Sequence, residues 1–78
     1  MKVSVKYFGV TAEKLGLEYE EFEIVVETSC LAREILEKRH PGLKQLTYAV
    51  SIDRKMRDVL KESDEIVEIA VLPPFAGG

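Results

Sequence analysis

The sequence is poor in the side chains on which most enzymes and metal sites depend. Its 78 residues include one cysteine, one histidine and no tryptophan. A single cysteine excludes an internal disulfide and a metal cluster held by cysteines. The lone histidine, His40, has no Ser-His-Asp spacing around it. We therefore expect no metal site, no bound cofactor and no catalysis by side chains of this domain.

Long apolar runs and an excess of positive charge are also missing. No segment approaches the roughly 18 to 20 apolar residues of a membrane helix, and residues 1–5 alternate where a signal peptide would be continuously apolar. Eleven basic residues against fourteen acidic ones give a net charge of −3. Because nucleic-acid phosphates require a positive surface, this balance argues against such a partner. We predict a cytoplasmic protein that binds neither membranes nor nucleic acids.

What the sequence does contain is the alternating pattern of half-buried strands. Four segments follow it, and they span residues 2–7, 20–26, 48–52 and 66–72. The first two segments could pair as a hairpin. Residues 54–61 fit a turn or a short helix equally well.

One longer segment has the pattern of an amphipathic helix. Residues 29–40 place four apolar side chains on one stripe, with Thr28 or Ser29 as the N-cap and Pro41-Gly42 as the stop. A short helical turn is predicted to begin at a Thr11 cap and to end at Gly16.

The order of these elements predicts an α+β fold. One amphipathic helix must bury its stripe against a sheet. We expect a mixed sheet of four or five strands packed against one main helix, with the first and last strands side by side, which is the β-grasp or ubiquitin-like arrangement. The globular domain would span residues 1–72, and residues 73–78 would form an extended tail.

The tail raises a functional question of its own. The chain ends "LPPFAGG", in which Pro73 and Pro74 favour an extended backbone and Phe75 is an apolar anchor. Gly77 and Gly78 lack Cβ atoms and can enter a channel too narrow for a side chain. The carboxylate of Gly78, once adenylated, is an acyl group that a sulfur donor or an amine can attack. The alternative is a frayed terminus without function.

Two further apolar residues point to a partner surface near the tail. By alternation, Phe8 and Leu72 fall on the sheet face opposite the core. An exposed apolar cluster usually marks an interface. We expect the interface to consist of Phe8, Leu72, Pro73, Pro74, Phe75 and Ala76; the alternative is that a strand end has lost register or that a loop covers Phe8.

The run "LPPFAGG", the acidic corner "SDE" at residues 63–65 and the early "KYFG" resemble the MoaD-like sulfur carriers, the small subunit of molybdopterin synthase. The resemblance implies that an E1-like adenylyltransferase uses ATP to activate Gly78, and that a sulfur donor converts it to a thiocarboxylate. It also implies that the tail enters the large synthase subunit and gives its sulfur to cyclic pyranopterin monophosphate in molybdenum or tungsten cofactor synthesis. Gly77 would supply clearance, and catalysis would belong to the partner.

Two other functions stay open because they use the same activated acyl group. One is a ubiquitin-like modifier whose Gly78 is joined to lysines of other proteins. The other is sulfur transfer for thiamine or for tRNA thiolation. Such carriers usually lack the Pro-Pro-aromatic run, which favours the molybdopterin route.

Overall fold

The N-terminal residues form a hairpin in the computed structural model, which describes residues 1–73. Strand β1 (Lys2–Tyr7) pairs antiparallel with β2 (Tyr19–Glu23), with Lys2 opposite Glu23 and Lys6 opposite Tyr19. The alternation of apolar and polar residues in both segments is the cause of this register, because a slip by one residue would expose every apolar side chain. The predicted hairpin is confirmed, although β2 ends earlier than residue 26.

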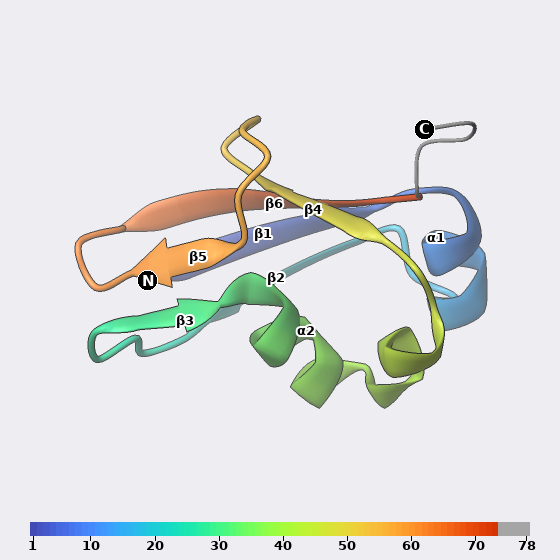
Figure 1. The fold of residues 1–78 in the computed structure, drawn as a ribbon, viewed down its shortest axis with the longest axis horizontal. Coiled ribbons are helices and arrows are strands. Elements are labelled where there is room, and N and C mark those ends of the chain that lie inside the picture. Colours follow the sequence, from blue (N-terminus) through green and yellow to red (C-terminus); the bar gives the residue numbers. More distant parts are fainter. Residues whose placement is uncertain (74–78) are drawn as a thin grey trace.

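The remaining strands complete a mixed sheet in the order β2-β1-β6-β4. Strands β1 and β6 (Ile66–Leu72) form the centre of this sheet and run parallel to each other. Strand β4 (Ala49–Ile52) runs antiparallel to β6 (Figure 1). A second, two-stranded sheet joins β3 (Ser29–Leu31) to β5 (Val59–Lys61). The four-stranded mixed sheet confirms the predicted α+β fold, whereas the small second sheet was not predicted.

The main helix begins later than the sequence pattern indicates. Helix α2 spans Ala32–Arg39, and neither Thr28 nor Ser29 caps it, so that prediction is wrong. The cap comes from a distant loop: the backbone oxygen of Asp58 accepts the Ala32 N–H at 2.6 Å, and its carboxylate accepts the Arg33 N–H at 3.0 Å. Because these two oxygens accept the first N–H groups of the helix, α2 needs no cap from Thr28 or Ser29. Residues 29–31 pair as strand β3 instead.

Two shorter helical segments support the ends of the sheet. Helix α1 spans Gly9–Leu15 and ends at Gly16, whose φ of 65° is left-handed as predicted. Thr11 is not its cap: it lies within the helix, is buried, and its hydroxyl donates to the Phe8 carbonyl at 2.6 Å. A 3₁₀ helix, η1 (Pro41–Gln45), follows α2 and buries Leu43.

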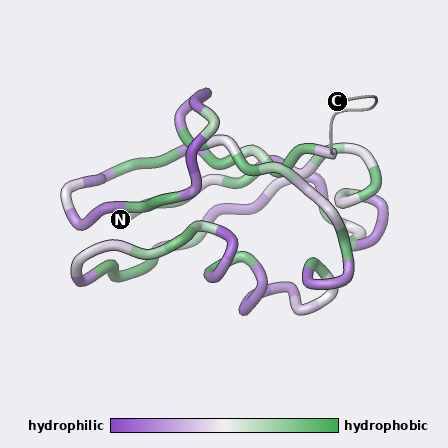
Figure 2. Tube along the Cα trace, viewed as in Figure 1, coloured by the Kyte–Doolittle hydropathy of each residue, from purple (hydrophilic) through white to green (hydrophobic). Residues whose placement is uncertain are grey.

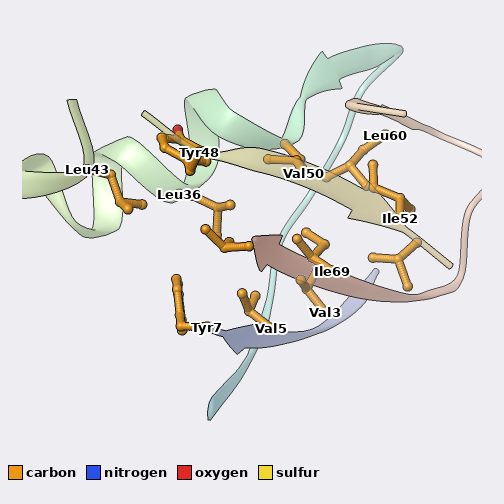
Figure 3. Packing of buried hydrophobic residues seen from close by; sticks show 13 residues of the cluster. Val3, Val5, Tyr7, Leu36, Leu43, Tyr48, Val50, Ile52, Leu60 and Ile69 are labelled. Atoms are coloured by element: carbon orange, nitrogen blue, oxygen red, sulfur yellow. The ribbon is translucent and has the colours of Figure 1, made fainter. Parts of the chain in front are cut away.

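The core lies between one face of the sheet and helix α2 (Figure 3). It receives the alternate, inward side chains of the strands, together with α2, η1 and β5. The thirteen buried apolar residues are Val3, Val5, Tyr7, Ala32, Leu36, Leu43, Tyr48, Val50, Ile52, Leu60, Val67, Ile69 and Val71. Among residues 1–73, no helix covers the other face of the sheet (Figure 1). Within residues 1–73, none of the helices has the length and apolarity needed to cross a bilayer.

Candidate functional site at the carboxyl ends of β1 and β6

The two central strands end at the same edge of the sheet because they are parallel. Tyr7 is opposite Val71 in the register, and the next N–H, that of Phe8, donates to the Val71 carbonyl at 3.1 Å. This hydrogen bond extends the pairing of β1 with β6 by one residue beyond Tyr7. It places Phe8 beside Leu72, the last residue of β6. Two segments far apart in the sequence therefore leave the sheet side by side (Figure 1).

The start of helix α1 is shaped to fit the end of β6. Gly9 has a φ of 58°, a left-handed conformation that suits glycine. A Cβ atom on Gly9 would lie 3.4 Å from Cγ of Pro73 and 3.6 Å from its Cβ. The exposed Pro73 thus leaves the sheet against the backbone of Gly9, and the two residues fix where the C-terminal segment begins.

An apolar row crosses the sheet at this edge, on the face away from α2. Leu72 is opposite Ala49 of β4, and the Phe8 side chain is 44% exposed. Leu72 and Ala49 are each partly buried. We name these three residues, Phe8, Leu72 and Ala49, the apolar row. The structure places Phe8 and Leu72 on this face, as the alternation predicted, and leaves Phe8 accessible; their role in binding a partner stays a prediction.

A shallow depression adjoins the apolar row on the same face. It has two cations, several small or hydroxyl-bearing side chains and two aromatic rings in its lining. The lining residues are Ser4, Lys6, Phe8, Tyr19, Ser51, Arg54, Glu68, Ile69 and Ala70. Ser51 is 8% exposed although it belongs to the uncovered face. Residues around Ser51 therefore cover that part of the otherwise uncovered sheet face.

Five predicted site residues lie outside the described part of the chain. They are Pro74, Phe75, Ala76, Gly77 and Gly78. Of the predicted interface, the structure brings together Phe8, Leu72 and Pro73, and it adds Gly9 and Ala49. Sequence reasoning missed Gly9, although a glycine directly after a strand is a signal for a positive φ or a close backbone approach.

The structure also shows a partly buried polar cluster under the start of β2. The Glu20 carboxylate accepts the Tyr7 hydroxyl at 2.5 Å and the Arg39 guanidinium at 2.8 Å. His40 Nε2 lies 2.6 Å from Oε2, the oxygen that also accepts the Tyr7 hydroxyl, whereas Arg39 binds Oε1. The Glu20 side chain is only 12% exposed, because Glu20 lies on the same face of β2 as Phe22, toward α2. The cluster ties the C-terminal end of α2 to β1 and β2.

The electrostatics of this cluster favour an ionised Glu20. Burial alone would raise the pKa of Glu20, but hydrogen bonds from Tyr7, His40 and Arg39 outweigh it and hold that pKa below its ordinary value. Burial first, and then the Glu20 carboxylate, raise the pKa of Tyr7 above that of a free phenol. Tyr7 therefore stays a neutral donor and Glu20 a charged acceptor. This is a stabilising network and not an acid–base pair poised near neutral pH.

Potential metal ligands do not gather in the part of the chain that the structure describes. Between residues 1 and 73, no group of three or more His, Cys, Asp or Glu side chains is arranged to hold an ion.

The topology and this edge define the class of protein: the chain has the β-grasp, ubiquitin-like fold. It is similar to molybdopterin converting factor subunit 1 from Pyrococcus furiosus, with a TM-score of 0.75 and 23% identity over 96% of this chain and 99% of that one. It is similar to SAMP1 from Haloferax volcanii, with a TM-score of 0.72 and 19% identity over the full length of both chains.

A third likeness is to the protein–protein complex of subunits 1 and 2 of molybdopterin-converting factor from Helicobacter pylori. The TM-score is 0.58 and the identity is 22%, over the full length of both chains. No family model matches the sequence, and no curated protein does. At these identities the likenesses establish the fold.

Proposed function

We propose that this protein is a sulfur carrier, the small subunit of a molybdopterin synthase, and that Gly78 is the residue that carries sulfur. The observation that supports the proposal best is the geometry of the exit from β6. The hydrogen-bonded ladder ends at Leu72, and Pro73 is exposed against Gly9 beside the accessible Phe8. A segment that starts there begins next to an apolar surface and outside the core.

The residues that follow suit delivery of a carboxylate into another protein. Pro73-Pro74 favours an extended backbone, and Gly77-Gly78 can pass a constriction that no side chain would clear. In the proposed reaction the Gly78 carboxylate attacks ATP on a partner enzyme and forms an acyl adenylate with loss of pyrophosphate. Sulfide from a donor then displaces AMP and leaves a thiocarboxylate; if the donor is a persulfide, its terminal sulfur displaces AMP and a thiol reductant cleaves the resulting S–S bond.

The last step needs a second partner. The thiocarboxylate sulfur attacks a carbon of cyclic pyranopterin monophosphate, and an oxygen substituent of that carbon leaves. Water then hydrolyses the acyl–sulfur bond, which leaves the sulfur on the pterin and returns Gly78 to a carboxylate. The solved neighbours that carry the converting-factor name, one of them from a complex of subunits 1 and 2, support this assignment. In this scheme the chain is a cosubstrate and the large subunit is the catalyst.

This chain has almost the same TM-score with SAMP1 as with the converting-factor subunit. Fold similarity alone therefore does not choose between a sulfur donor and a lysine of another protein as the group that attacks the activated Gly78. The test is the intact mass of the protein purified from its own cell, followed by mapping of its C-terminal peptide. We expect an increase equal to one oxygen-to-sulfur exchange, located on Gly78. An unmodified C-terminus together with Gly-Gly remnants on lysines of other proteins would overturn carriage and favour conjugation.

A genetic test separates the pathways. Deletion of Gly78 removes the proposed reactive group and leaves residues 1–73 unchanged, so we expect loss of molybdenum-cofactor synthesis with a normally folded protein. Intact cofactor synthesis in this strain would overturn the synthase assignment. If the strain that lacks Gly78 loses thiamine synthesis or tRNA thiolation and keeps molybdenum-cofactor synthesis, the carrier belongs to the pathway that is lost.

A further inference from the structure

The loop after β4 begins with an unusual turn. Asp53 and Arg54 have φ values of 51° and 67°, and no other residue except glycine has a positive φ between residues 1 and 73. Ile52 and Lys55 exchange both backbone hydrogen bonds, at 2.9 and 3.0 Å, so the turn is a two-residue hairpin. Such turns favour Asn-Gly or Asp-Gly, and an arginine is uncommon at the second position.

The turn is fixed to the neighbouring strand. Asp53 donates its N–H to the Glu68 carbonyl at 2.8 Å, and its carboxylate accepts the Glu68 N–H at 2.9 Å. Arg57 lies 3.5 Å from the second carboxylate oxygen. Asp53 thus continues the pairing between β4 and β6, and this anchoring determines the position of the next residue, Arg54.

The turn brings Arg54 to the uncovered face of the sheet. In Figure 1 the β4–β5 loop rises on the side away from α2, and Figure 2 shows its tip as hydrophilic. Arg54 lines the depression next to the apolar row, as do Lys6 and Ser51. Two cations from distant parts of the chain therefore border the same hollow, directly beside Phe8.

Arg54 differs from the other arginines in its charge balance. Arg33, Arg39 and Arg57 each pair with a carboxylate. Neither Arg54 nor Lys6 has an ion-pair partner within residues 1–73, and Glu68, which lines the same depression, pairs with neither. In a chain of net charge −3, two unpaired cations beside an apolar row complement an acidic group on another molecule.

We propose that Arg54 and Lys6 form a cationic rim that receives a carboxylate of the protein on which the apolar row docks. This inference rests on the proposed function, and the partner is the large synthase subunit. Its docking surface would combine apolar side chains for the row with at least one Asp or Glu for the rim. Charges at the rim of an interface mainly set the association rate and the choice of partner.

The experiment compares charge reversals at the rim with matched reversals outside it. Arg54→Glu and Lys6→Glu are the test variants. Lys55→Glu is the control in the same turn, and Lys2→Glu is the control on the same face of β1. Association with the purified large subunit from the same organism is followed by stopped-flow fluorescence at several salt concentrations, and thermal melts check that all four variants are folded.

We expect each test variant to reduce the association rate about tenfold or more at low salt, with controls within about threefold. The difference should shrink as salt rises, since the Debye length falls to about 8 Å at physiological ionic strength. Partial recovery of Arg54→Glu when an acidic residue of the large subunit is changed to lysine would establish the pairing directly. Equal rates for test and control variants would overturn the inference.

The outcome is separable from that of the proposed function. Suppose that the wild-type protein carries the thiocarboxylate and that all variants associate with the large subunit at the same rate. The cationic-rim proposal is then overturned, and the sulfur-carrier proposal stands. If the wild-type protein neither carries sulfur nor binds the large subunit, both proposals are overturned.

Discussion

The two faces of the central sheet are built from the same strands and have opposite properties. In β1, Val5 is fully buried under α2, whereas Lys6 beside it is exposed. In β6, Ile69 is 2% exposed and Glu68 is exposed. Because successive residues of a strand point to opposite faces, one short sequence carries both sets. The covered set stabilises the fold, and the uncovered set is available for contact with another molecule.

The uncovered face is itself divided along the strands. At the carboxyl ends of β1 and β6 lie the apolar row and the rim formed by Lys6 and Arg54. The opposite end carries two carboxylates, Glu21 and Glu23, with one lysine, Lys2, and the exposed Ile66, while Glu68 lies between the two ends and borders both of them. A partner with acidic and apolar groups would be attracted by the first end and repelled by the second. If the cationic rim receives a carboxylate of a partner, this polarity would orient that partner toward the exit of the C-terminal segment.

The largest expected effect is on the covered face. Leu36 is fully buried in α2, so Leu36→Ala should lower the free energy of unfolding by about 2–5 kcal/mol, through lost burial and the cavity that remains. Lys38→Ala, on the exposed side of the same helix, should change it by less than about 0.5 kcal/mol. Urea denaturation measures both. Equal effects would mean that α2 does not bury its apolar stripe as the structure shows.

The Glu20 cluster should rank next and depend on pH. Glu20→Gln removes the charge that Tyr7, Arg39 and His40 surround, and we expect a loss of about 1–3 kcal/mol at pH 7. Because the folded-state pKa of Glu20 is lowered, its contribution is present above the ordinary glutamate pKa and is lost as the pH falls through the folded value. The variant and wild type should therefore converge in acid.

The control for Glu20 is its neighbour on the uncovered face. Glu21→Gln changes the same charge one residue along β2, where the side chain is exposed. Urea titrations of both variants at several pH values should show a constant, small difference for Glu21→Gln. A pH-independent effect at Glu20 would contradict its assignment as the charged acceptor of the cluster.

Gly9→Ala tests the junction between α1 and the end of β6. At a φ of 58° an alanine costs roughly 1–2 kcal/mol, and its Cβ would lie in van der Waals contact with the Pro73 ring, 3.4 Å from Cγ. Gly42→Ala is the matched control, since no atom lies within 4 Å of its Cβ position and its φ is not positive. Thermal melts should show a lower Tm for Gly9→Ala alone. An unchanged Tm would contradict the left-handed φ of Gly9 at the start of α1.

The smallest effect on stability, and the one that separates the two faces, is expected at Phe8. Phe8→Ala should change the free energy of unfolding by about 1 kcal/mol or less, since the ring is 44% exposed. If the apolar row docks on the large subunit, the Kd should rise about tenfold or more, as for a buried aromatic anchor. Ile66→Ala, 71% exposed at the acidic end of the same face, should leave the Kd unchanged.

Sequence patterns predicted the fold well where a residue's surroundings depend on periodicity. Strands β1 and β6, the hairpin, the left-handed Gly16 and the inward side chains Val67, Ile69 and Val71 are as expected. Predictions failed where a distant segment changed a local preference. Asp58 replaced Thr28 or Ser29 as the cap of α2, and pairing with β5 turned the expected first helical turn into β3.

The sequence by itself determined the two-sided character of each strand, because alternation needs no knowledge of the partner strand. It also placed Phe8 and Leu72 opposite the core. Only the tertiary structure decided the parallel register of β1 and β6, which were expected to lie side by side. It alone also decided that Pro73 leaves the sheet against Gly9, and that the turn at Asp53 and Arg54 brings a second cation beside Lys6. These relations join residues 48 to 64 positions apart in the chain, and side-chain periodicity along one segment carries no information about which other segment lies next to it.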